Sequence, residues 1–165
     1  MTSKTVTSTH AFAILAPVPE MHLASGLEAV SIQLDADLKP KIAFGSNAFE
    51  VFREVDKLRD GKLVDVFIYA SHSQEDQSLD RMVTWKATYI GHVESRRGHY
   101  PGNKKYRPES TKTDSPQWAI FWEVEGLEKL RTSIPIGTLM GLNSTRLYAP
   151  QFAPEGPVLI EHPMP

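Results

Sequence analysis

The chain has 165 residues, of which 41% are hydrophobic, and it contains three Trp, seven Phe, five Tyr and no Cys. This length favours one domain, residues 1–165, with enough apolar side chains for a core. The lack of Cys excludes disulfides, thiol nucleophiles and Cys-ligated zinc or iron–sulfur sites. The formal net charge of −2 is not that of a polycation. No apolar run reaches the roughly 18 residues of a membrane span and the N-terminus lacks a secretory signal, so we expect no membrane association and a cytoplasmic protein.

The first half of the chain predicts a strand, two short segments and a helix. Residues 10–16 form an apolar run closed by two prolines, which is typical of a buried strand. Residues 28–34 and 41–44 are predicted as short extended pieces, and the first of them is also compatible with a helix. Residues 49–58 carry apolar side chains every three or four positions and charged ones between them, which predicts one main amphipathic helix ending before Gly61.

The second half predicts mainly strands. Residues 63–70 are rich in β-branched and aromatic side chains, which favours a mostly buried strand. Residues 83–93 and 117–125 alternate with period two and predict two long strands that pair as an extended ribbon. Residues 133–142 favour a further short strand or a turn, and residues 158–160 supply a last apolar run. The count favours an α+β domain whose small mixed or antiparallel sheet is curled or closed as a β-barrel.

Two segments lack the apolar content of core structure. Residues 95–116 contain three Pro, two Gly and almost no aliphatic side chain, which predicts a long loop. Residues 150–165 form a Pro-rich tail. Positive charge gathers around the loop, because residues 81–112 hold eight Lys or Arg and only two acids, so the remainder of the chain is strongly acidic. A cationic surface on an acidic protein favours an anionic partner at one place.

The order of these elements resembles the PUA-like superfamily and, within it, the EVE and ASCH groups. The segments that carry the resemblance are GKLVDVFIYA at 61–70, WKATYIGHV at 85–93 and WAIFWEV at 118–124. It implies a pseudo-barrel with a pocket that recognises RNA or a modified base. The ASCH pattern Gly-x-Lys-x-x-Glu-x-Arg has no counterpart in this chain, so catalysis of the ASCH kind is not expected.

The loop mixes cations with aromatic rings, which is the combination that single strands and flipped bases require. We predict phosphate contacts by the Lys and Arg side chains and base stacking by the two Tyr side chains. The candidate nucleic-acid-binding residues of the loop are Arg96, Arg97, His99, Tyr100, Lys104, Lys105, Tyr106 and Arg107. Trp85 is a further candidate for base recognition. Trp85, Trp118 and Trp122 all lie in alternating strands, however, where core packing is the commoner role of a ring.

Other functions have less support in the sequence. The six His residues show no metal-ligand spacing, and no P-loop, dinucleotide fingerprint or nucleophile elbow occurs, so we predict no metal, no cofactor and no catalytic residue. One alternative is a small nuclease or nucleotide hydrolase that uses His72 or His99 as a general base. A second alternative is a protein-interaction module whose loop becomes ordered on an acidic partner. The sequence leaves RNA or DNA preference and the oligomeric state open.

Overall fold

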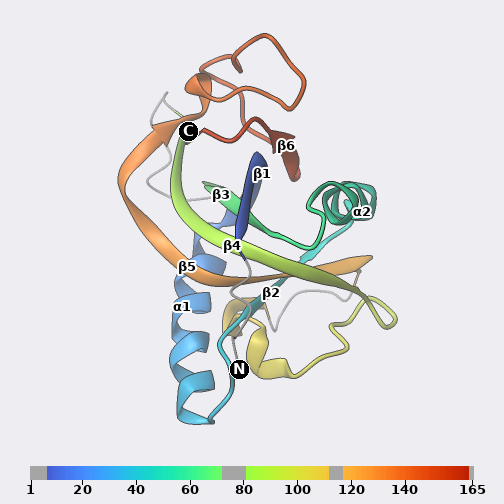
Figure 1. Cartoon of the computed structure of the whole chain (residues 1–165). Coiled ribbons are helices and arrows are strands. Elements are labelled where there is room, and N and C mark those ends of the chain that lie inside the picture. The colour runs from blue at the N-terminus through green and yellow to red at the C-terminus, as the bar shows by residue number, and fades with distance from the viewer. Residues whose placement is uncertain (1–6, 72–80, 112–116, 164–165) are drawn as a thin grey trace, which may run out of the picture.

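The computed structural model describes residues 7–71, 81–111 and 117–163, which form one six-stranded sheet with two helices (Figure 1). The strands are β1 (Ser8–Pro19), β2 (Ile42–Ser46), β3 (Leu63–Ser71), β4 (Met82–Glu94), β5 (Ile120–Pro135) and β6 (Val158–Ile160), and the helices are α1 (Glu20–Asp35) and α2 (Phe49–Leu58). The predicted α+β class is confirmed. Neither helix in these ranges is long and apolar enough to cross a bilayer.

The sheet is open. Its strand order is β2-β5-β4-β3-β1-β6, and β1 pairs with β3 in parallel while the other neighbours are antiparallel. The predicted ribbon of two long strands is confirmed by the pairing of β4 with β5. The sheet is strongly curved (Figure 1). It is not a closed barrel, because the end strands β2 and β6 do not pair with each other in the described ranges. The curled form of the prediction therefore fits better than the closed form.

Helix α1 corrects the expectation of one main helix. Residues 28–34, predicted as extended or helical, lie in the second half of this 16-residue helix. Of the four buried residues of α1, which are Leu23, Gly26, Ala29 and Gln33, only Leu23 has a large apolar side chain, and four large apolar side chains of the helix are exposed instead. The helix therefore has no single apolar face, which is why period-3.6 analysis of the sequence does not detect it.

Strand β5 is ten residues longer at its C-terminal end than the predicted strand, which ended at residue 125. Gly126 has a φ of +66° and lies where the register between β4 and β5 shifts. A residue in this conformation at a β-bulge is most easily a glycine. The bulge lets β5 bend and continue to Pro135, followed by a 3-10 turn at Ile136–Thr138, where the sequence favoured a short strand or turn.

The two faces of the sheet carry separate apolar clusters. The larger cluster contains Phe52 of α2, whose ring stacks at 5.6 Å on both Tyr89 of β4 and Trp122 of β5. The smaller cluster lies under the C-terminal segment and includes Phe67, Ile136 and Ile160. Trp85 belongs to the larger cluster and is 4% exposed, so its ring packs in the core and is not accessible for base stacking.

Candidate nucleic-acid interface

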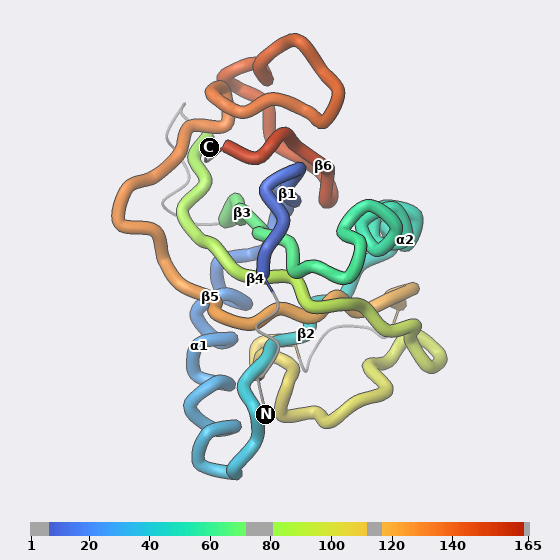
Figure 2. Tube along the Cα trace, in the orientation of Figure 1, coloured from blue at the N-terminus to red at the C-terminus, as the bar shows by residue number. Residues whose placement is uncertain are grey.

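The basic loop is folded against the rest of the molecule. Its described part, residues 95–111, contains a backbone-bonded turn between Arg96 and His99 and two 3-10 turns, Lys104–Tyr106 and Glu109–Thr111, that pack on α1. Figure 2 shows this segment, in yellow, running from the end of β4 to the side of α1. Residues 112–116 of the predicted loop lie outside the described residues.

Side chains of α1 hold the loop at two places. Near the C-terminal end of the helix, Gln33 Nε2 donates to Lys105 O at 2.8 Å and to Lys41 O at 2.8 Å. Near the start of the helix, Ser110 N donates to Ser25 Oγ at 3.0 Å, and Ser110 Oγ lies 2.7 Å from His22 Nδ1. The loop thus has a defined course along the whole helix.

Tyr100 fixes the loop to β5. Its hydroxyl donates to Glu123 Oε2 at 2.5 Å, and its ring meets Phe121 edge-on at 5.3 Å. Lys41 Nζ lies 3.0 Å from the same carboxylate oxygen, and Glu123 is 8% exposed. Burial, and then the hydrogen bond to Glu123, raises the pKa of Tyr100 above its ordinary value. Tyr100 is therefore a neutral hydrogen-bond donor at physiological pH.

Tyr106 and Arg107 also contact the body of the protein. Arg107 Nη1 donates to Ala43 O of β2 at 2.7 Å, and the guanidinium carbon lies 4.9 Å from the centre of the Phe121 ring. Lys41 Nζ lies 4.7 Å from the centre of the Tyr106 ring. We call Tyr100, Tyr106 and Arg107 the anchor residues, because each is partly buried and contacts a strand or its flank.

The other candidates of the loop are exposed. We call four of them the exposed cations, and they are Arg96, Arg97, Lys104 and Lys105. His99 is exposed as well, and its backbone closes the turn with Arg96. Structure thus divides the eight predicted loop residues into three that hold the loop and five that face solvent.

A pocket of about 510 Å³ opens beside the end of the loop. Its aromatic lining consists of Phe44, Trp118 and Trp122, and its polar lining includes side chains from the helix, the loop and the tail. The complete lining is Ala16, Pro17, Val18, Pro19, His22, Phe44, Gly45, Ser46, Asn47, Ala48, Arg107, Thr111, Trp118, Trp122, Glu155, Gly156 and Pro157. Arg107 and Thr111 make the basic loop one wall of this pocket.

Trp118 is positioned by β2 and the residues that follow it. A Cβ atom at Gly45 would lie 2.4 Å from Cγ and Cδ1 of the indole, so only glycine permits this approach of the ring to the strand. The next residue, Ala119, donates its N–H to Asn47 Oδ1 at 2.9 Å. Trp118 is half-buried while Trp85 and Trp122 are buried, which makes Trp118 the most accessible of the three Trp rings.

The sequence did not reveal most of the pocket. His22, Asn47 and Glu155 line it beside the rings, and none of them belongs to a local motif. The lining comes from β1, α1, β2, the loop, β5 and the tail, so only the tertiary structure brings these residues together. The single local signal was an aromatic residue at position 118, inside the strand predicted at 117–125.

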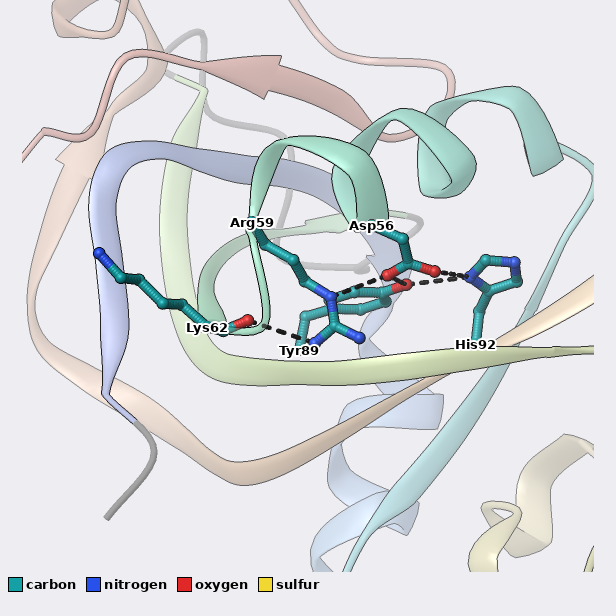
Figure 3. A network of polar contacts seen from close by, with 5 residues as sticks. All are labelled: Asp56, Arg59, Lys62, Tyr89 and His92. Atoms are coloured by element: carbon teal, nitrogen blue, oxygen red, sulfur yellow. Dashed lines mark hydrogen bonds and ion pairs between the residues drawn. The ribbon is translucent and has the colours of Figure 1, made fainter. Parts of the chain in front are cut away.

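A separate polar network joins α2 to β4 (Figure 3). Asp56 accepts from Tyr89 OH at 3.0 Å and Arg59 Nε lies 2.9 Å from its Oδ1, while His92 Nδ1 lies 2.9 Å from its Oδ2. Burial, and then Asp56, raises the pKa of Tyr89. The same Nδ1 of His92 lies 3.0 Å from Tyr89 OH, and the other ring nitrogen points away from Asp56 (Figure 3).

This network does not include the histidines that the sequence suggested as general bases. His72 lies outside the described residues, and His99 is at the exposed turn of the loop. In the described ranges no three His, Asp or Glu side chains are grouped so that they could hold a metal ion.

Comparison with known proteins leaves the family open. No family model matches the chain, and no curated protein sequence does. Among solved structures, the crystal structure of human THYN1 protein in complex with DNA containing 5-methylcytosine aligns with a TM-score of 0.40 and 16% sequence identity, covering 76% of this chain and 71% of that chain. This score does not establish a shared fold, so the PUA-like resemblance stays a prediction.

Proposed function

We propose that this protein binds nucleic acid by placing one base in the pocket lined by Trp118 and by contacting the neighbouring phosphates with the exposed cations. The observation that carries the proposal is that the basic loop bears the exposed cations and also forms one wall of the pocket. The loop that holds Lys104 and Lys105 continues into Arg107 and Thr111, which line the aromatic pocket. A nucleic-acid strand bound along the loop therefore reaches the pocket.

The pocket suits a planar heterocycle. Its volume of about 510 Å³ lies in the range of roughly 300–1,000 Å³ of small-ligand sites. The half-buried ring of Trp118 supplies a surface for stacking, with the buried rings of Phe44 and Trp122 behind it as apolar lining, and the side chains of Asn47 and Arg107 supply polar groups for a base edge. This combination favours an unpaired or flipped base, including a modified base, over a base inside a duplex.

The exposed cations supply attraction to the backbone. Four Lys or Arg side chains face solvent on one loop of a chain whose net charge is −2. Contacts of this kind release counterions from phosphates and are independent of sequence. Because the anchor residues already hold the loop in place, little conformational entropy is lost when a strand binds.

Trp118→Ala tests the pocket. The measurement is fluorescence anisotropy of labelled 12-nucleotide single-stranded RNA and DNA at constant salt, with Phe49→Ala as the control. Phe49 is an exposed ring outside this pocket. Loss of one stacked base, worth about 1–3 kcal/mol, weakens binding about 5- to 150-fold in the Trp118 variant.

The outcomes separate the two halves of the proposal. Equal affinity of wild type and Trp118→Ala would show that the pocket does not hold a base. Absence of binding by the wild-type protein to either strand, at low salt, would overturn the nucleic-acid function itself. Tighter binding of an oligonucleotide with one modified base would identify the pocket's preferred ligand.

A further inference from the structure

Exposed apolar side chains gather on one helix. Among the described residues, α1 carries four of the seven large hydrophobic side chains that are substantially exposed. These four are Met21 (64% exposed), Leu27 (40%), Ile32 (51%) and Leu34 (57%). Single exposed apolar residues are ordinary on a protein surface, whereas a cluster on one element marks an interaction site.

The helical repeat arranges these side chains in two rows. At 100° per residue, Leu27 and Leu34 point in nearly the same direction, and Met21 and Ile32 form a second row. Glu28 and Asp35 point between the two rows, and both are exposed. The inward side of the helix, at Leu23, Gly26, Ala29 and Gln33, is buried. The outer face of α1 therefore consists of two apolar rows with the carboxylates of Glu28 and Asp35 between them.

The negative charge of α1 limits which molecules can bind its outer face. Residues 20–38 contain four acids and no Lys or Arg. A second copy of this chain would bring its own acidic row against this one, and nucleic acid or an anionic membrane would be repelled in the same way. The face is complementary to a segment that carries apolar side chains on both sides of a row of cations.

We propose that the outer face of α1 binds a cationic amphipathic helix of a partner protein. Apolar side chains of the partner cover Leu27 with Leu34 and Met21 with Ile32, while its Lys or Arg side chains pair with Glu28 and Asp35. This surface lies on the side of α1 that faces away from the sheet, so it is distinct from the pocket and does not depend on nucleic-acid binding. Helix-on-helix recognition of this kind uses anchors three, four or seven residues apart.

Charge reversal tests this surface. The probe is a fluorescein-labelled 18-residue helical peptide of Leu and Lys with Leu at helix-face spacing, and the matched probe replaces every Lys with Glu. The variant is Glu28→Lys/Asp35→Lys. Its control is Glu50→Lys/Glu54→Lys, which changes the net charge equally on the exposed side of α2. We expect wild type and control to bind the Leu/Lys peptide, and the α1 variant to lose at least about tenfold in affinity and to gain binding of the Leu/Glu peptide.

A second variant tests the apolar rows. Leu27→Ser/Ile32→Ser keeps the charge and is expected to weaken the Leu/Lys peptide about tenfold, whereas Leu147→Ser, at a residue that is 60% exposed elsewhere, leaves it unchanged. Circular dichroism verifies that each variant is folded. Equal affinity of all variants, no binding by wild type, or a dimer in sedimentation that Leu27→Ser/Ile32→Ser dissociates would overturn the proposal.

Discussion

The exposed cations and the anchor residues belong to the same loop but differ in what surrounds them. Lys104 and Lys105 face solvent, whereas Arg107, two residues later, donates to the edge of β2 and lies over the Phe121 ring. In the sequence, all three are simply cations within two positions of Tyr106. The difference shows that a cation–aromatic pattern has two possible uses, one in holding a loop and one in meeting a ligand, and that burial separates them.

Substitution of an anchor residue should give the largest effect, since it acts on both stability and binding. Arg107→Gln removes a charge-assisted hydrogen bond to Ala43 O and the contact with Phe121. We expect a loss of about 1.5–3 kcal/mol in the free energy of unfolding and weaker nucleic-acid binding. Urea denaturation measures the first effect and anisotropy the second. Arg96→Gln removes the same charge from the exposed set and is expected to stay within about 0.5 kcal/mol of wild type in stability.

Substitution of exposed cations should change binding alone. If all four exposed cations contact phosphates, the affinity for a single strand falls about fiftyfold between 50 and 200 mM salt, since each contact contributes about 0.7 to the log–log slope. Lys104→Glu/Lys105→Glu is expected to reduce this fall to about sevenfold, with weaker binding at every salt concentration. A salt dependence identical to wild type would place the bound strand away from these lysines. Unfolding in urea should be unchanged.

Alkaline pH should give a slightly smaller loss of stability than Arg107→Gln, and it acts through the anchor residue Tyr100. Burial and Glu123 raise the pKa of Tyr100 above its ordinary value near 10, so the neutral form is favoured in the folded protein. Its contribution to stability is complete below about pH 10 and is lost as the pH rises further. Tyr100→Phe removes this contribution and the hydrogen bond, so it should lower stability at pH 8 by about 1–3 kcal/mol and flatten the alkaline decline. Urea denaturation at several pH values measures both. A decline as steep as that of wild type would assign the effect to Tyr89.

Strands that alternate or are apolar throughout could be predicted from the sequence. Residues 63–70 and 83–93 became β3 and β4 with ends shifted by a residue or two, and the helix at 49–58 became α2. Each of these elements buries one face or both, so the spacing of its apolar residues in the sequence indicates which side chains are buried. Helix α1 does not follow this rule, because Met21 and Ile32 lie on its outer face and the buried Gln33 lies on its inner one.

The candidate site was predictable only in part. Local composition identified the loop, but hydrogen bonds between distant residues, such as Tyr100 with Glu123, decide which of its side chains remain exposed. The pocket depends on the approach of Trp118 to Gly45, and the pairing of β2 with β5 creates this contact between residues far apart in the chain. The sequence did not show that Trp118 lines the pocket while Trp85 packs in the core.

Gln33 has a consequence for how the molecule behaves in concentrated solution. Its side chain accepts from Lys41 N at 2.9 Å and donates to Lys41 O, next to the free side of β2, and Arg107 covers Ala43 O further along. An uncovered outermost strand is a template on which another chain can add its own strand and start an aggregate. The buried amide and the guanidinium together leave an incoming strand fewer backbone groups to pair with, so they protect the folded protein against fibril-like assembly.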